Sequence, residues 1–143
     1  MPARSTGEAP EKRLPAFAAV IGFIDAVNRG DVDRLGELMT DDHFLRVFDE
    51  PPLRGRAANI DAWRAYTSAF PRYSISPHRL AEQDGVVSVL GHTIRSHLGL
   101  ADDEEAKSRI IWTARVESGR LASWELTEDT PERRRELGLE SPT

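Results

Sequence analysis

The stretch "SRIIWTARVESGRLASWELT", residues 108 to 127, predicts a β-hairpin near the end of the chain. The Ser-Gly dipeptide at 118–119 suits a two-residue turn, and strand-like runs lie on either side of it. An Asp-Gly dipeptide at 84–85 separates two further runs, residues 73–83 and 86–97, in the same way. Four strands in two antiparallel hairpins are therefore expected in the second half of the chain.

The first half of the chain carries helical patterns instead. Apolar residues follow helical spacing, and the boundary residues fit, with Gly30 as a C-terminal cap, Asp31 as an N-cap and Pro71 as a stop. A strand and a short C-terminal helix complete the series. The expected helices are residues 14–28, 31–39, 57–70 and 130–137, and the expected first strand is residues 43–48.

This order predicts an α+β fold, in which helices pack on one face of a mainly antiparallel sheet. A chain of 143 residues suffices for one domain with one core. We therefore expect a flexible N-terminal tail over residues 1–13 and a single domain over residues 14–143.

Composition excludes several functions. The chain has no cysteine, so disulfides, thiol nucleophiles and thiolate metal sites are ruled out. A net charge of -5 with scattered arginines argues against nucleic acid as a partner. No apolar run is long enough to cross a membrane, and the first residues lack the apolar core of a secretory signal, so a cytoplasmic location is expected.

Several short motifs follow one another in a familiar order. They are "FIDAVNRGDVDRLGELMTDD" at 23–42, "LRGRAANIDAW" at 53–63, "RSHLG" at 95–99 and "ESGRLASWEL" at 117–126. From Leu14 to Leu139 the sequence resembles the nuclear transport factor 2-like superfamily, and in particular its SnoaL-like branch. In the "SWE" motif, Ser123 stands where polyketide-cyclase-like members have histidine, and Glu125 where they have aspartate.

The resemblance implies a curved sheet wrapped around a cone-shaped cavity that the helices close. Members of the superfamily include ketosteroid isomerases, limonene epoxide hydrolases, scytalone dehydratases and cyclases, and also proteins that only bind partners. The fold alone therefore does not decide the function.

The hairpin register predicts which side chains face this cavity. If residues 118–119 form the loop, Val116 pairs with Leu121 and Trp112 pairs with Glu125, and paired residues share a face of the sheet. The face with Trp112 is the more apolar, so it is assigned to the cavity, and Glu125 is expected there as an acid with a raised pKa. A three-residue loop would reverse the faces, and a solvated Glu125 is the alternative.

The opposite face would carry Ile111, Trp124 and Leu126. An apolar outer face on a curved sheet suits contact with a second copy of the chain, so a homodimer is expected.

Two of the histidines are candidates for the site. His97 fits the "RSHLG" motif, and His92 is the alternative, since residues an odd number apart point to opposite faces of an unbroken strand. A bulge at Gly91 would be needed to bring them together as a metal pair. Either of these two can also be a structural hydrogen-bonding residue, and His43 is expected at a loop edge. No metal site and no cofactor are expected.

Three other side chains complete the expected site. Arg46 could orient an anion if its strand face looks inward, while Trp63 and Tyr66 would form core and cavity wall, with the Tyr66 phenol as a hydrogen-bond donor. With Glu125 and His97 as catalytic groups and Trp112 and His92 beside them, the first hypothesis is acid/base chemistry without a cofactor on a small, largely apolar molecule. The second hypothesis is a binding module without catalysis.

Overall fold

The computed structural model describes residues 10–140, with side chains from residue 15. Within this range the helices are α1 (Pro10–Arg29), α2 (Val32–Glu37), α3 (Arg56–Ala69), α4 (Asp102–Ala106) and α5 (Pro131–Leu137). The strands are β1 (Met39–Val47), β2 (Leu53–Arg54), β3 (Ser74–Gln83), β4 (Val86–Ile94), β5 (Ile110–Glu117) and β6 (Arg120–Glu128). The predicted α+β class is confirmed.

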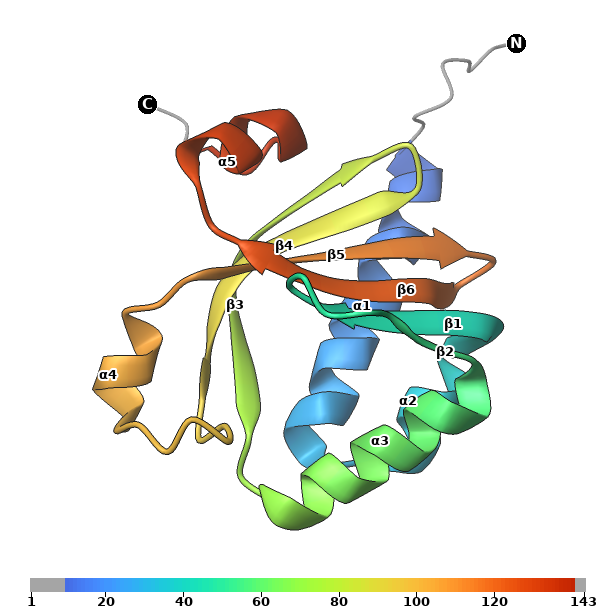
Figure 1. The fold of residues 1–143 in the computed structure, drawn as a ribbon. Coiled ribbons are helices and arrows are strands. Elements are labelled where there is room, and N and C mark those ends of the chain that lie inside the picture. The colour runs from blue at the N-terminus through green and yellow to red at the C-terminus, as the bar shows by residue number, and fades with distance from the viewer. Residues whose placement is uncertain (1–9, 141–143) are drawn as a thin grey trace, which may run out of the picture.

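The described strands form one curved, open sheet in the order β2-β1-β6-β5-β4-β3 (Figure 1). Neighbouring strands are antiparallel except for β1 and β6, which run parallel. The prediction of a mainly antiparallel sheet is therefore confirmed. Parallel pairing places the N-terminal strand beside the C-terminal hairpin.

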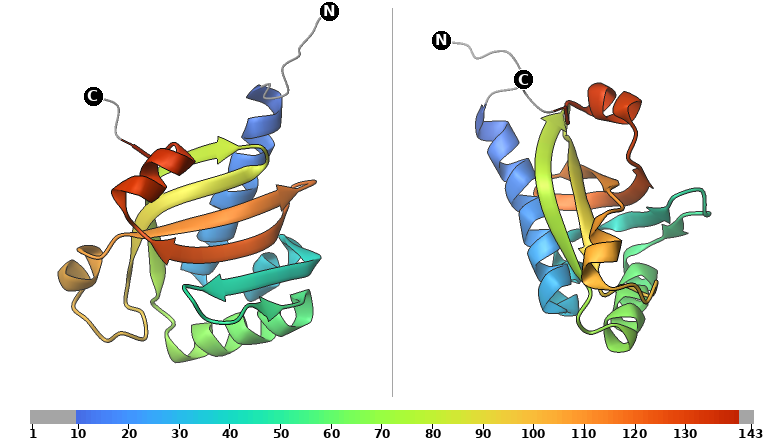
Figure 2. Two further views of the ribbon diagram at one scale, coloured as in Figure 1. Left: turned by 45° about the horizontal axis from the view of Figure 1, so that its top comes forward. Right: turned by 90° about the vertical axis from the view of Figure 1, so that its left-hand side faces the viewer.

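Two helices lie on opposite faces of this sheet. Helix α1 covers the inner face and α5 the outer face over β3 and β4, as the right-hand view of Figure 2 shows. Phe23 of α1 is fully buried in the main core on the inner face. On the outer face Leu139, which follows α5, closes a smaller cluster with Leu90 and Ile111.

The first two helices end and begin where the sequence predicts. Gly30 has φ = 67°, the left-handed conformation that glycine tolerates, and Asp31 caps α2 by accepting from the Arg34 amide at 3.1 Å. Helix α1 begins at Pro10, inside the segment expected to be a flexible tail. Residues 1–9 of that segment lie outside the described range.

Two elements were not predicted. Strand β2 has two residues and helix α4 has five, and such lengths are too short for a period to show in the sequence. Strand β4 also ends earlier than expected, at Ile94, because Arg95 has φ = 58° and leaves the strand conformation. The following residues, including His97, therefore belong to a loop.

Both two-residue hairpin turns form as predicted, but the register of the second is predicted correctly only near the turn. Val116 pairs with Leu121 as expected. Beyond a bulge, Thr113 and not Trp112 is opposite Glu125. The predicted pairing of Trp112 with Glu125 is therefore wrong, and the face assignment that depended on it is reversed for the end of β6.

The bulge has a physical cause in the packing of Trp124. Three residues of β6, 122–124, face two residues of β5, 114–115, so β6 carries the extra residue. This places the Trp124 ring 4.9 Å from Phe23 and 6.2 Å from Trp112, and only 1% of Trp124 is exposed. The free energy gained by burying the large indole ring exceeds the free energy lost where the regular pairing of β5 and β6 is interrupted.

No helix within the described range combines the length and the apolar character that crossing a bilayer requires.

Candidate functional site

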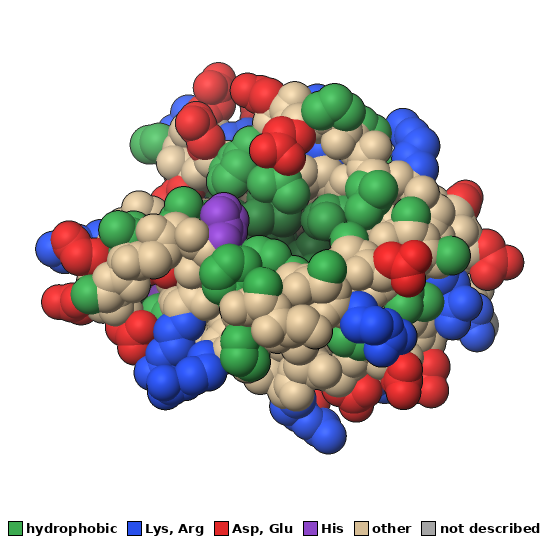
Figure 3. Space-filling view, turned by 60° about the horizontal axis from the view of Figure 1, so that its bottom comes forward, with side chains coloured by type: hydrophobic (Ala, Val, Ile, Leu, Met, Phe, Trp, Pro, Cys, Tyr) green, Lys and Arg blue, Asp and Glu red, His purple; other side chains and the backbone are tan. Residues whose placement is uncertain are grey.

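A cavity of about 190 Å³ opens between α3 and the inner face of the sheet. In the space-filling view a hollow lined by hydrophobic side chains lies on this side of the molecule, with a histidine at its rim (Figure 3). The residues that line it are Leu45, Val47, Ala62, Trp63, Tyr66, Tyr73, His97, Trp124 and Leu126. Its polar groups come from only a few of these side chains.

The sheet side of the cavity follows from strand alternation. Leu45 and Val47 of β1 lie two residues apart and share a face, as do Trp124 and Leu126 of β6. Leu45 pairs with Trp124 and Val47 with Leu126 across the parallel strands. Four apolar side chains thus form one continuous wall.

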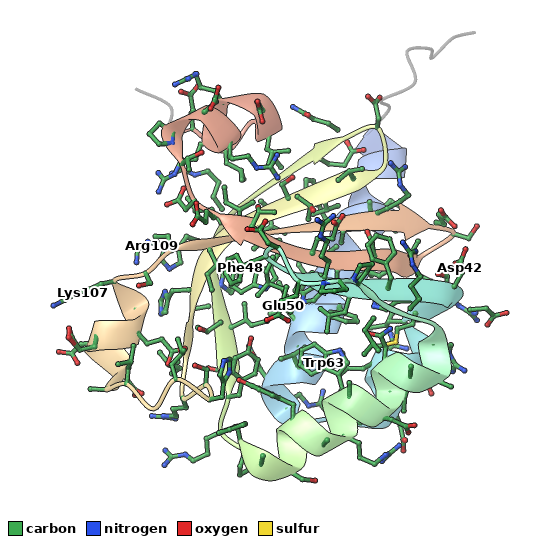
Figure 4. The ribbon with its side chains drawn as sticks, viewed as in Figure 1. Asp42, Phe48, Glu50, Trp63, Lys107 and Arg109 are labelled. Carbon is green, nitrogen blue, oxygen red and sulfur yellow. The ribbon has the colours of Figure 1, made fainter. Side chains whose placement is uncertain are left out.

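Helix α3 forms the opposite wall and is held at its start by Asn59. This fully buried side chain donates to the carbonyl oxygens of Gly55 at 2.8 Å and Leu53 at 3.0 Å, which ties the helix to β2. Trp63 and Tyr66 follow one and two turns later on the same side of the helix. Figure 4 shows Trp63 directed from α3 into the space below the sheet.

Tyr66 and His97 form the polar pair of the cavity. The Tyr66 oxygen accepts a hydrogen bond from the His97 backbone amide at 3.0 Å, and it lies 2.9 Å from Nδ1 of the His97 ring. If the phenol donates to Nδ1, the Nε2 atom carries the ring proton; if Nδ1 donates, Nε2 is free to accept one. The neutral His97 ring can therefore carry its proton on Nε2 or on Nδ1 while it stays hydrogen-bonded to Tyr66.

Aromatic rings surround this pair. Tyr73 meets Tyr66 edge-on with ring centroids 5.0 Å apart, and Phe70 lies 4.8 Å from Tyr66 and 6.2 Å from His97. Burial raises the pKa of both tyrosine phenols, so both keep their protons at neutral pH. The Tyr73 hydroxyl has no hydrogen-bond partner among residues 10–140. It is a donor that a bound molecule could use.

Three of the residues expected in the site lie together at the cavity: His97, Tyr66 and Trp63. Trp112 does not line it, since its ring is fully buried in the main core behind Trp124. Tyr73 lines the cavity and was missed, although its position directly before the β3 run could have suggested it.

Glu125 lies on the other face of the sheet. Its neighbours Trp124 and Leu126 both face the cavity, so strand alternation turns Glu125 outward, where it is partly exposed. Arg46, which is exposed, is its partner on β1. The expectation that Glu125 faces the cavity is wrong because of the β6 bulge. The condition set for Arg46 is not met either, since Leu45 and Val47 on both sides of it face the cavity.

His92 and His43 also lie outside the cavity lining. His92 is 2.7 Å from His78 across β3 and β4, through their Nδ1 and Nε2 atoms. His43 is fully buried instead of lying at a loop edge, and its Nδ1 donates to the Leu121 carbonyl at 2.6 Å. The bulge considered at Gly91 occurs on the partner strand, at His78.

The residues expected to form an outer dimer surface are not available for one. Ile111 is fully buried in the cluster with Leu139, Trp124 is in the core, and Leu126 lines the cavity. This surface was predicted from the wrong register. The homodimer itself stays a prediction.

Within the described range no group of three or more His, Cys, Asp or Glu side chains could hold a metal ion.

Comparison with known sequences agrees with this architecture. The sequence profile described as SnoaL-like domain matches residues 20–124, which is most of the chain. The chain belongs to the SnoaL-like family. A search of curated proteins finds no significant match to this sequence.

Solved structures with the same fold share little sequence with this SnoaL-like chain. A cystatin-fold protein from Novosphingobium aromaticivorans is 18% identical, with a TM-score of 0.67 over 78% of this chain and 96% of the other. A putative polyketide cyclase from Sinorhizobium meliloti is 22% identical, with a TM-score of 0.62 over 76% and 93%. An epoxide hydrolase of the LEH-like type from M. tuberculosis is 18% identical, with a TM-score of 0.63 over 87% and 90%. These similarities show the fold and leave the activity to the site.

Proposed function

We propose that this SnoaL-like protein binds a small, largely apolar molecule in the cavity and exchanges a proton with an oxygen atom of that molecule through Tyr66 and His97. The observation that carries the proposal is the Tyr66–His97 hydrogen bond at the edge of an otherwise apolar wall. A cavity of this kind favours an apolar body, and one polar pair orients one polar group.

The volume limits the size of the molecule. An apolar cavity of about 150 Å³ admits benzene, and this cavity measures about 190 Å³. A single six-membered ring with one small substituent therefore fits. The substituent would be a carbonyl, hydroxyl or epoxide oxygen, because Tyr66 and Tyr73 present hydroxyl donors to it.

The chemistry follows from the two protonation states of the pair. Tyr66 remains protonated because burial raises its pKa, so it can polarise an oxygen by donating a hydrogen bond. The exposed His97 ring at the rim can take or return a proton through Nε2. Proton abstraction next to a carbonyl, dehydration, cyclisation and epoxide opening are all compatible with this pair. Two of the structural neighbours, a putative polyketide cyclase and an epoxide hydrolase, also favour chemistry of this kind.

Binding can be tested with benzene, phenol and cyclohexanone as probes, followed by ligand-induced NMR shifts of the protein. We expect Tyr66→Phe to weaken phenol and cyclohexanone about fivefold, which corresponds to one neutral hydrogen bond of about 1 kcal/mol, and to leave benzene unchanged. Leu126→Trp should fill the cavity and remove binding of all three probes. Binding of all three that survives Leu126→Trp would contradict this location.

Catalysis can be tested separately with cyclohexanone in deuterium oxide. If the pair moves protons, the carbons beside the carbonyl exchange hydrogen for deuterium faster than in buffer, and His97→Gln abolishes the gain while cyclohexanone still binds. His92→Gln is the matched control and should have no effect.

A binding protein without catalysis is the second candidate. The observation that favours it is that none of the carboxylates among residues 15–140 lines the cavity, while Trp63 and Trp124 form part of its wall. Binding of cyclohexanone with no exchange above buffer would support this candidate over the enzyme.

A further inference from the structure

Glu105 is a buried carboxylate close to the candidate site. Only 2% of it is exposed, and no other Asp, Glu, Lys or Arg among residues 15–140 is buried. None of the ion pairs within the described range involves it. A buried charge without a counterion is costly unless hydrogen bonds compensate for the lost water.

The compensating bonds come from the end of β4 and the loop after it. The Thr93 hydroxyl donates to one Glu105 oxygen at 2.5 Å, and the Ser96 amide donates to the other at 3.4 Å. Thr93 and Ser96 are themselves buried. Glu105 thus joins helix α4 to the residue that directly precedes His97.

The loop that carries His97 is held by side chains at three successive amides. The Ser96 amide donates to Glu105, the His97 amide to the Tyr66 hydroxyl at 3.0 Å, and the Leu98 amide to the Ser96 hydroxyl at 3.2 Å. Residues 95–98 themselves lie outside the strands and helices, so no regular backbone hydrogen-bond ladder fixes them. Its conformation therefore depends on these bonds.

We propose that Glu105 is a positioning residue, whose buried carboxylate fixes the Ser96 backbone so that the His97 ring meets the Tyr66 hydroxyl at the cavity wall. Glu105 does not line the cavity, so it acts through the loop and not on a bound molecule. The inference deepens the proposed function, since it concerns the same Tyr66–His97 pair.

The charge of Glu105 gives a second, electrostatic consequence. After burial, which is the larger cause, the negative charge of Glu105 helps to raise the pKa of the Tyr66 and Tyr73 phenols. Tyr66 also faces His97 through its hydrogen bond. Removing the charge should make both phenols ionise at lower pH.

The ionisation of the two phenols can be followed by absorbance without interference from other tyrosines. The 143 residues of the chain include two tyrosines, Tyr66 and Tyr73, and both line the cavity. Tyrosinate ultraviolet absorbance of the ligand-free protein therefore reports on this site alone. We expect Glu105→Gln to lower the pH at which absorbance begins to rise. Glu104→Gln is the matched control, since Glu104 is exposed on the same helix and should leave the onset unchanged.

Positioning is tested by the imidazole NMR signals of His97 in the same ligand-free protein. Tyr66→Phe gives the signals of an uncoupled His97, and we expect those of Glu105→Gln to move toward them. The His78 and His92 signals should stay in place as an internal control for the fold. Glu105→Asp should not restore the wild-type His97 signals, because the shorter side chain keeps the charge but cannot reach both donors.

Wild-type His97 signals in a folded Glu105→Gln protein would overturn the proposal. If Glu105→Gln does not fold, Glu105→Asp takes its place, because its shorter side chain cannot reach both donors, and wild-type His97 signals in that variant have the same meaning. These measurements need no ligand. A failure to bind or exchange cyclohexanone would therefore reject the proposed function without deciding the role of Glu105, and the reverse also holds.

Discussion

Glu105 and Glu125 show how differently two carboxylates of one chain can be placed. Glu105 belongs to the acidic run "DDEE" at 102–105, which is typical of a solvated surface, yet it is 2% exposed. Glu125 stands between Trp124 and Leu126, which both face the cavity, yet it is partly exposed on the other side. Tertiary contacts, and not sequence neighbours, decide which carboxylate leaves water.

The largest expected effect on this contrast comes from substituting two adjacent residues of β6. Trp124→Ala should lower the free energy of unfolding by about 3 to 5 kcal/mol, because it empties the space beside Phe23. Glu125→Ala should change it by less than about 0.5 kcal/mol. Denaturant unfolding measures both. Equal effects, or a larger effect at Glu125, would mean that the bulge is misplaced.

A second test compares the two carboxylates directly. Glu105→Ala leaves the Thr93 hydroxyl and the Ser96 amide without an acceptor, and each such loss costs about 1 to 3 kcal/mol. The Ser96 bond is long, at 3.4 Å, so its loss should cost only about 1 kcal/mol, and we expect a total loss of about 2 to 4 kcal/mol by the same denaturant measurement. Glu104→Ala is the control on the same helix, and a similar loss there would show that α4 is merely sensitive to any change.

A third, smaller effect concerns His43, a buried base on β1, the strand next to β6. Burial lowers the pKa of His43 below its usual 6.5, so the unfolded chain binds a proton that the folded protein resists. Stability is therefore present above pH 6.5 and is lost as the pH falls toward the folded pKa. We expect His43→Asn to flatten this dependence in thermal unfolding.

His78 needs its own control in that experiment, because its pKa is also lowered, first by burial and then by Arg109 and His92. His78→Gln should leave most of the pH dependence in place. If His78→Gln flattens the curve and His43→Asn does not, the assignment to His43 is wrong.

The smallest effect concerns Asp129, directly after β6. Arg134 donates two hydrogen bonds of 2.7 Å to this carboxylate and holds its pKa below 3.8. The pair contributes stability above pH 3.8 that is lost as the pH falls below it. Asp129→Asn should cost less than about 1 kcal/mol at neutral pH. A cost as large as that of Glu105→Ala would remove the distinction between the fully buried carboxylate without an ion-pair partner and the carboxylate paired with Arg134.

Local signals in the sequence predict most of the fold. Gly30, Asp31 and the two hairpin dipeptides each have one favoured backbone role, and the structure places them in it. The β6 bulge could not be predicted, because it depends on where Phe23 of α1 meets the sheet. That contact lies about a hundred residues away in the chain, and a period of two carries no information about it.

The candidate site was predicted only in part for the same reason. Trp63 and Tyr66 follow from the helical period, and His97 from its motif, so these were found. Glu105 was missed because α4 is too short to show a buried face and its partners lie on β4. Glu125 was placed in the cavity because a regular strand was assumed.

The parallel pairing of β1 with β6 also affects how the chain reaches its native state. His43 and the Leu121 carbonyl that it binds are 78 residues apart in the chain. During synthesis β1 emerges well before β6, so until the last hairpin is made, Leu45 and Val47 lack the strand that covers one side of them. Contacts between such distant segments form slowly, and an unpaired apolar strand edge invites association with other chains. The nascent protein is therefore most prone to aggregation just before β6 is complete.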